Sequence, residues 1–118
     1  MFRFKTYNLI LIFIGAIPGG LLRWQLQDYF VANLIGALVI GIVMGMKLSD
    51  SNNLMLGFGF CGSLTTYSSW IIHSINLLFN GSYLEAFSSI ISLLLIGLTF
   101  VFMGFAIGNL IRKIMLIQ

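Results

Sequence analysis

Four long apolar runs, separated by short polar stretches, constrain this chain more than any other feature of its sequence. They cover about residues 7–24, 29–46, 54–79 and 83–110, and the three acidic residues lie at or beyond the run ends, at Asp28, Asp50 and Glu85. A helix needs roughly 20 residues to cross a hydrocarbon core about 30 Å thick. The pattern therefore predicts an all-α, multi-pass protein of the cell (inner) membrane, with four transmembrane helices in one domain spanning residues 1–118.

The composition excludes several other classes of protein. Charged residues make up 8% of the 118 residues, whereas an ordinary soluble domain carries roughly 25%. A water-soluble fold is therefore excluded, and four passes leave no room for a soluble domain. The single Cys61 and the single His73 exclude an intrachain disulfide and any multi-cysteine metal or redox site. In so apolar a chain, a net charge of +3 indicates the orientation of the chain in the membrane and does not indicate nucleic-acid binding.

The basic residues are unevenly divided between the two sides of the predicted membrane. Four passes put both termini on one side, and cytoplasmic loops carry the excess of Lys and Arg. One side holds five of the six basic residues and the other holds only Arg23; the five are Arg3, Lys5, Lys47, Arg112 and Lys113. The sequence therefore predicts that both termini lie in the cytoplasm.

The apolar runs hold no buried carboxylate, and this bears on mechanism. A proton-coupled exporter normally needs such a relay inside the membrane, which argues against the small multidrug exporters that share this length and number of passes. Serine, histidine and acid are not arranged as a hydrolytic set either, so the chain is not expected to be an enzyme.

The third run is the most informative stretch. Residues 57–67 read GFGFCGSLTTY and place three glycines and three hydroxyl residues in the middle of a membrane pass. This favours a helix that is broken mid-membrane, where non-helical backbone must be buried in protein or line a hydrated cavity. Freed carbonyls can coordinate a hard cation such as Na⁺. The alternative is an unbroken, glycine-rich helix packed closely on a neighbour.

Aromatic and polar residues elsewhere in the runs are candidates for an ion path. Tyr67, Trp70 and His73 recur every third residue, and ring edges are the positive part of an aromatic quadrupole; packing or interfacial roles remain the alternative. Asn33 begins a stripe that continues through Ala37, Gly41 and Gly45. The small residues predict close helix packing, and the amide could donate to a passing anion.

Two more features have a functional and a purely structural interpretation. Ser88, Ser92 and Thr99 share one face of the fourth helix, where they form a polar track or bond back to their own helix. Arg23, at the end of the first run, either extends to the headgroups or gives a vestibule a positive potential.

Three motifs, taken in order and spacing, resemble the fluoride channels called Fluc or CrcB. They are GGLLRW at 19–24, ANLIGA at 32–37 and GFGFCGSLTTYSSW at 57–70. The resemblance implies a passive, fluoride-selective export channel that lowers cytoplasmic fluoride. It also implies two subunits in antiparallel orientation, two pores, and a structural Na⁺ held by backbone carbonyls of the broken third helices.

Carried over residue by residue, the resemblance assigns roles to particular positions. Gly62 and Thr65 match the positions whose carbonyls hold Na⁺, and Arg23 matches the vestibule arginine. The fluoride pore would be lined by Asn33, Tyr67, Ser68, Trp70 and, on the fourth helix, Ser92. Fluoride is small and strongly hydrated, so a selective path must replace its water with donors and positive ring edges.

The sequence departs from that family in two respects. Tyr67 and Trp70 stand where the family has its pore phenylalanines, and the larger Trp ring could alter or block a pore. The excess of basic residues on one side opposes insertion in both orientations, so we expect a related chain as the opposed partner, with a homodimer of opposed copies as the alternative. The rival interpretations are a non-conducting partner subunit of a heterodimeric channel and, more weakly, a small multidrug-type exporter.

Overall fold

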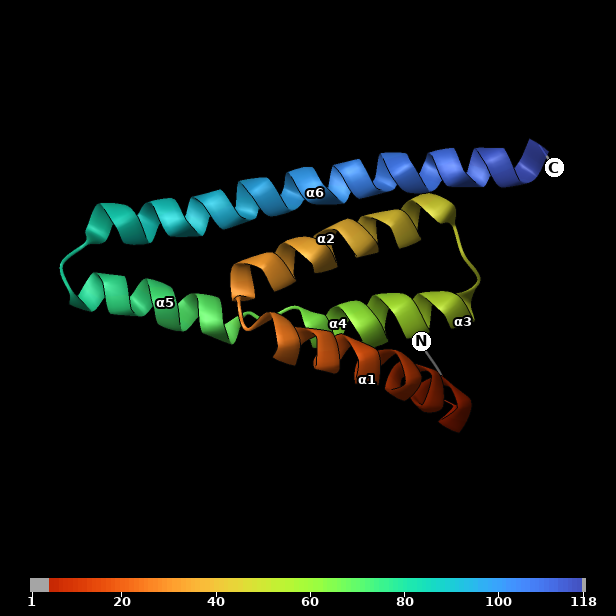
Figure 1. Ribbon diagram of the computed structural model, residues 1–118, viewed down its shortest axis with the longest axis horizontal. Helices are drawn as coiled ribbons and strands as arrows, with labels where there is room; N and C mark the ends of the chain where they lie inside the picture. The colour runs from red at the N-terminus through yellow and green to blue at the C-terminus, as the bar shows by residue number, and fades with distance from the viewer. Residues whose placement is uncertain (1–4, 118) are drawn as a thin grey trace.

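Three long helices dominate the computed structural model, which describes residues 5–117 (Figure 1). They are α1 (Thr6–Leu26), α2 (Tyr29–Met46) and α6 (Tyr83–Ile117), and each is long and apolar enough to cross a membrane. Their positions agree with the first, second and fourth apolar runs of the sequence. The predicted all-helical membrane protein is confirmed at this level.

The third apolar run and the polar residues just before it form several pieces in place of one long helix. They are the single turn α3 (Asp50–Asn52), the π-helix η1 (Asn53–Cys61), the short α4 (Gly62–Leu64) and α5 (Ser68–Phe79). Residues 65–67 between α4 and α5 are not helical. Each piece is shorter than a membrane-crossing helix, so the third predicted pass is not among the three long spans.

Local signals explain where α2 begins and ends. The carboxylate of Asp28 caps its N-terminus by accepting hydrogen bonds from the N–H groups of Phe30 at 2.8 Å and Val31 at 3.3 Å. A side-chain acceptor at this position satisfies N–H groups that have no partner inside the helix. Lys47 ends the helix in the left-handed region, with φ of 50°. The polar residues between the runs therefore act as helix boundaries.

Helix α6 extends beyond the predicted run. The apolar run ends near residue 110, but the helix continues through Arg112 and Lys113 to Ile117. A charged pair ends a stretch that suits the hydrocarbon core, whereas Arg and Lys are themselves good helix formers. The end of a membrane run therefore did not coincide with the end of a helix.

The helices pack through glycines that bring backbones together. In Figure 1, α2 lies beside the C-terminal part of α6, and α5 lies beside its N-terminal part; α1 packs on η1 and α4. A side chain at Gly41 or Gly45 would collide with the backbone of α6 at Val101 or Phe105, and one at Gly104 would collide with the Leu38 carbonyl of α2. The packing interpretation of the Gly41 and Gly45 stripe is confirmed.

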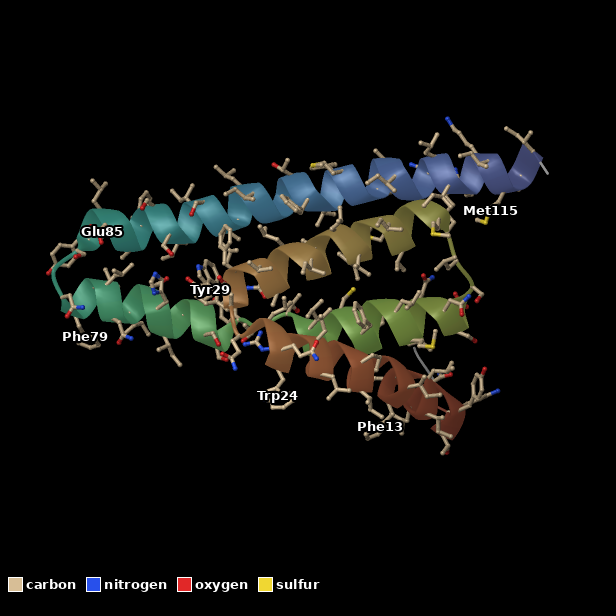
Figure 2. The ribbon with its side chains drawn as sticks, viewed as in Figure 1. Phe13, Trp24, Tyr29, Phe79, Glu85 and Met115 are labelled. Carbon is tan, nitrogen blue, oxygen red and sulfur yellow. The ribbon has the colours of Figure 1, made fainter. Side chains whose placement is uncertain are left out.

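Large apolar side chains face outward along the whole molecule. Phe13, Trp24 and Phe79 project away from the bundle in Figure 2, and Phe79 is 85% exposed. Such a surface suits contact with lipid or with another apolar chain. The start of α1 and the end of α6 lie at the same end of the long axis (Figure 1). Arg3, one of the basic residues counted above, lies outside the described residues.

Candidate functional site

The candidate site is built around the interruption between α4 and α5. Thr65 is extended, with φ −80° and ψ 154°, and α5 resumes at Ser68. The preceding π-helix has the i→i+5 hydrogen-bonding pattern that is rare in proteins and is frequent at functional sites. Two consecutive β-branched residues, Thr65 and Thr66, lose side-chain freedom in a helix and suit extended backbone. These local preferences explain why the helix stops after Leu64.

Asn33 of α2 holds the interruption from one side. Its Nδ2 donates to the Thr66 carbonyl at 3.0 Å, and its Oδ1 accepts from the Thr66 N–H at 2.7 Å. These bonds satisfy polar groups that the broken helix leaves without helical partners. Nδ2 carries a second hydrogen, and no hydrogen bond within residues 5–117 uses it. The Asn33 side chain therefore stabilises the interruption, and its second Nδ2 hydrogen is available to another acceptor.

Arg23 of α1 holds the interruption as well. Its Nη1 donates to the Leu64 carbonyl and its Nη2 donates to Ser69 Oγ, both at 3.3 Å. Leu64 is the last residue of α4, and Ser69 lies in the first turn of α5. The guanidinium also lines an open groove at the end of α1, together with Gly20, Trp24, Gln27 and Asp28. It is therefore half-buried and adjacent to a surface cleft, as a vestibule residue would be.

Gly62 and Thr65 lie on a second open groove. It is lined by Asn33, Gly36, Ala37, Ile40, Gly57, Cys61, Gly62 and Thr65. The Thr65 hydroxyl turns away to donate to the Cys61 carbonyl at 3.0 Å. Among residues 5–117, no hydrogen bond engages the carbonyl oxygens of Gly62 or Thr65. Backbone carbonyls are ligands that hard cations prefer, so these two oxygens fit the chemistry expected for Na⁺.

Tyr67, the last residue of the interruption, and Trp70, in the first turn of α5, lie on a third groove. Its lining consists of Asn33, Thr65, Thr66, Tyr67, Trp70, Leu93 and Leu94. The two rings meet edge to face, with centroids 5.4 Å apart. Tyr67 is 71% exposed, whereas Trp70 is 8% exposed and its buried Nε1–H has no hydrogen-bond partner among the described residues. The pair therefore presents one accessible ring and one enclosed ring.

The predicted hydroxyl groups separate into two sets. Ser68 Oγ is 3.2 Å from Thr66 Oγ1, at the interruption itself. The hydroxyls of the polar track on α6 each donate to a carbonyl of their own helix: Ser88 to Glu85, Ser92 to Ser89 and Thr99 to Leu95. Ser92 is not among the residues that line the grooves described above. The structure thus brings Asn33, Tyr67 and Trp70 onto one groove. Ser68 contacts Thr66 of that groove without lining it, and Ser92 directly precedes Leu93 of the lining.

His73 stands apart from the polar contacts. Its ring lies 5.8 Å from that of Tyr29, at an interplanar angle of 42°, which is a packing contact between α5 and the start of α2. The described residues contain no group of three or more His, Cys, Asp or Glu side chains that could hold a metal ion.

Sequence reasoning missed the backbone and hydroxyl partners at the interruption. The Leu64 carbonyl, the Thr66 peptide and Ser69 are each bonded by a side chain more than 30 residues away in the sequence. The consecutive threonines after a glycine-rich stretch were the available signal, because they mark where helix becomes unfavourable. Which distant side chains would satisfy the freed groups depends on how the helices pack.

Comparison with known proteins identifies the family. Residues 10–105 match the family described as CrcB-like protein, Camphor Resistance (CrcB). A Prochlorococcus marinus (strain MIT 9313) protein named Fluoride-specific ion channel FluC 2 is 44% identical over 98 residues, covering 83% of this chain and 79% of the relative. A Synechococcus sp. (strain CC9902) protein of the same name is 37% identical, covering 95% of this chain and 87% of the relative. The chain belongs to the CrcB family.

Proposed function

We propose that this chain is a subunit of a fluoride-selective channel that exports fluoride passively and lowers its concentration in the cytoplasm. The proposal agrees with the names of its relatives as fluoride-specific ion channels. The observation that carries it is the hydrogen-bonded interruption between α4 and α5, where an amide with a spare donor lies beside two aromatic rings on an open groove. This is a set of weak donors without a carboxylate.

The residues around the interruption supply what an anion path requires. Fluoride leaves water only where donors and positive ring edges replace its hydration. In the proposal, the second Nδ2 hydrogen of Asn33, the Ser68 hydroxyl and the edges of Tyr67 and Trp70 contact the ion. Arg23 attracts it electrostatically from the vestibule. Ser92 would contribute from α6 only if its hydroxyl released the Ser89 carbonyl.

The membrane arrangement in this proposal has four passes. The pieces α3 to α4 and α5 together make the third pass, and the interruption lies near mid-membrane, with its backbone satisfied by protein groups as the apolar phase demands. Both termini face the cytoplasm, in keeping with the basic residues at the start of α1 and the ends of α2 and α6.

Na⁺ is the proposed structural cation. The carbonyl oxygens of Gly62 and Thr65 would hold it, and when bound it would supply a fixed positive charge that ties the interruption together. Two carbonyls are too few for a hard cation, which usually takes six or more oxygen ligands. A second chain that contributed the same carbonyls would double the protein ligands, and this supports a dimer that shares the cation; the family resemblance implies that its two chains are antiparallel. Removing Na⁺ should therefore cause the dimer to dissociate, measured by size-exclusion chromatography with light scattering.

The opposed chain is proposed to be a related chain, because the excess of basic residues on one side favours a single orientation. Single cysteines placed near each terminus, in a Cys61→Ala background, would report orientation through labelling by an impermeant thiol reagent. We expect labelling from the cytoplasmic side alone. Equal labelling from both sides would instead support a homodimer of opposed copies.

The function itself is tested by fluoride efflux from liposomes. The purified chain is reconstituted alone and together with a related family member, and efflux is followed with a fluoride electrode against a chloride control. Rapid efflux of fluoride without chloride, in either preparation, supports the channel. If neither preparation of folded protein conducts fluoride, the chain is not a channel subunit. If only the mixture conducts, the partner chain is obligatory.

A further inference from the structure

Arg23 does more at the interruption than carry a positive charge. Its two terminal nitrogens bond to opposite sides of the break: Nη1 to the Leu64 carbonyl that ends α4, and Nη2 to the Ser69 hydroxyl in the first turn of α5. The guanidinium therefore spans the non-helical residues 65–67 from α1, a helix that is separated from them by about 40 residues of sequence.

Arg23 and Asn33 together engage some backbone groups of the interruption and leave others free. Arg23 engages the Leu64 carbonyl, and Asn33 engages both polar groups of the Thr66 peptide. The Thr65 carbonyl lies between these bonded groups, and the Gly62 carbonyl lies two residues before Leu64; neither is hydrogen-bonded within the described residues. The bonded groups fix the backbone on both sides of the Thr65 carbonyl and on the C-terminal side of Gly62. The directions of the free carbonyls thus depend on the two side chains.

We propose that Arg23 is a positioning residue, whose guanidinium fork sets α5 relative to α4 and thereby aims the Gly62 and Thr65 carbonyls at the cation. The inference deepens the proposed function, since it rests on the Na⁺ site proposed above. A guanidinium presents several donors in a rigid plane, whereas an ammonium is a compact point charge on a flexible stem. Two acceptors on different helical segments can be held at a fixed separation by the fork and not by the ammonium.

The fork and the charge have opposite effects on Na⁺ affinity, which makes the role testable. A positive charge beside the cation repels it, so a residue that acted only through its charge would weaken Na⁺ binding. Replacing such a residue by Gln would strengthen Na⁺ binding, and replacing it by Lys would leave binding unchanged. A positioning fork instead predicts weaker Na⁺ binding for Arg23→Lys, because this variant keeps the charge and loses one of the two hydrogen bonds.

The experiment uses full-length chain in detergent and measures two quantities. The first is hydrogen–deuterium exchange at the amides of residues 65–70, and the second is the Na⁺ concentration that gives half-maximal dimer assembly. The variants are Arg23→Lys, Arg23→Gln and Ser69→Ala, which removes only one acceptor. Gln25→Ala is the matched control, because Gln25 is exposed on the same helix and lies outside the site.

We expect Arg23→Lys to raise exchange at residues 65–70 and to raise the half-maximal Na⁺ concentration roughly tenfold, as the loss of one charged hydrogen bond implies. Ser69→Ala should shift both quantities in the same direction by about two- to threefold, and Gln25→Ala should shift neither. Unchanged exchange in both Arg23→Lys and Ser69→Ala would overturn the proposal, and so would a lower half-maximal Na⁺ concentration in Arg23→Gln alone.

The two readouts separate this inference from the proposed function. If the wild-type dimer assembled equally well without Na⁺, the structural role proposed for Na⁺ would be wrong. Hydrogen–deuterium exchange at residues 65–70 would still show whether Arg23 stabilises the interruption. If fluoride efflux were present and Na⁺-dependent but insensitive to Arg23→Lys, the channel would stand and the positioning role would fall.

Discussion

The contact between α2 and α6 and the interruption between α4 and α5 satisfy their backbones in opposite ways. Along α2 and α6 each helix satisfies its own peptide groups, and glycines such as Gly41 and Gly104 let the two backbones touch. At the interruption the helix gives up its bonds, and side chains from α1 and α2 replace them. The first region tolerates no added atoms, whereas the second depends on particular donors and acceptors.

We interpret the contact between α2 and α6 as the scaffold and the interruption between α4 and α5 as the candidate site. Dry contacts between backbones fix the position of helices, because packed interiors respond strongly to any change in volume. Polar groups held by distant side chains can instead exchange partners, and an ion can be one of those partners. We therefore expect substitutions in the first region to affect folding and substitutions in the second to affect conduction.

The largest expected effect is the loss of folded protein on substitution of Gly104. Its added methyl in Gly104→Ala would collide with the Leu38 carbonyl, whereas Gly97 on the same helix has open space around it. Gly104→Ala should lower stability by about 1–3 kcal/mol or more, read as a lower melting temperature and less monodisperse protein in detergent. Gly97→Ala serves as the control and should leave the fold of the subunit unchanged. Equal melting temperatures for the two variants would contradict the tight contact.

Substitution of Asn33 is the next largest effect, and it should act on conduction. Asn33→Asp keeps an acceptor for the Thr66 N–H but loses the donor to its carbonyl, and it adds a negative charge to the anion path. Leaving one such group unsatisfied costs about 1–3 kcal/mol, so we expect fluoride efflux to fall at least tenfold. Asn33→Ala should also reduce efflux, without the added charge. Efflux at the wild-type rate in Asn33→Asp would exclude the amide from the path.

Trp70→Phe tests the enclosed ring with a smaller expected effect. Truncating a buried aromatic normally destabilises a protein, but this change also removes the unpartnered Nε1–H, and a buried donor without a partner is itself destabilising. The two contributions oppose each other, so the melting temperature should resemble that of Trp24→Phe, a control at a 73% exposed position. A markedly lower melting temperature for Trp70→Phe alone would contradict this balance and show that the lost indole packing outweighs the relief of the unpartnered Nε1–H.

The smallest expected effect is at the α6 hydroxyls. Ser92 and Thr99 both donate to carbonyls of their own helix, and such back-bonding contributes little to stability. Ser92→Ala and Thr99→Val should each leave fluoride efflux within about twofold of wild type. A large loss in Ser92→Ala, with Thr99→Val unaffected, would place Ser92 in the pore as the family resemblance implies.

Run length predicted the three long helices well, because a helix that crosses the hydrocarbon core must consist of about 20 consecutive apolar residues. The bounds of α2 at Tyr29 and Met46 match the predicted run, and Asp28 marks its start. The C-terminal extension of α6 to Ile117 was not predicted, because Arg112 and Lys113 end a hydrocarbon-compatible run but do not end a helix.

The contacts at the interruption were not predictable from the sequence, although the side chains that make them had been singled out as candidates. Asn33, Arg23, Tyr67 and Trp70 stood out by type and spacing, but their partners are fixed by packing between helices that are distant in sequence. Nothing in the stretch around Leu64 indicates that Arg23 would reach it, or that η1 would be a π-helix. Such contacts depend on how α1 and α2 approach the interruption, which local propensity does not encode.

Fluoride selectivity is tested most directly by electrical recording across a planar bilayer that contains this purified chain, alone or together with a related family member. With unequal fluoride concentrations on the two sides, and chloride balancing the total anion concentration, a fluoride-selective pore has a reversal potential that follows the fluoride gradient. We predict that behaviour. A reversal potential that followed chloride, or a cation gradient, would contradict the assignment of the interruption as a fluoride path.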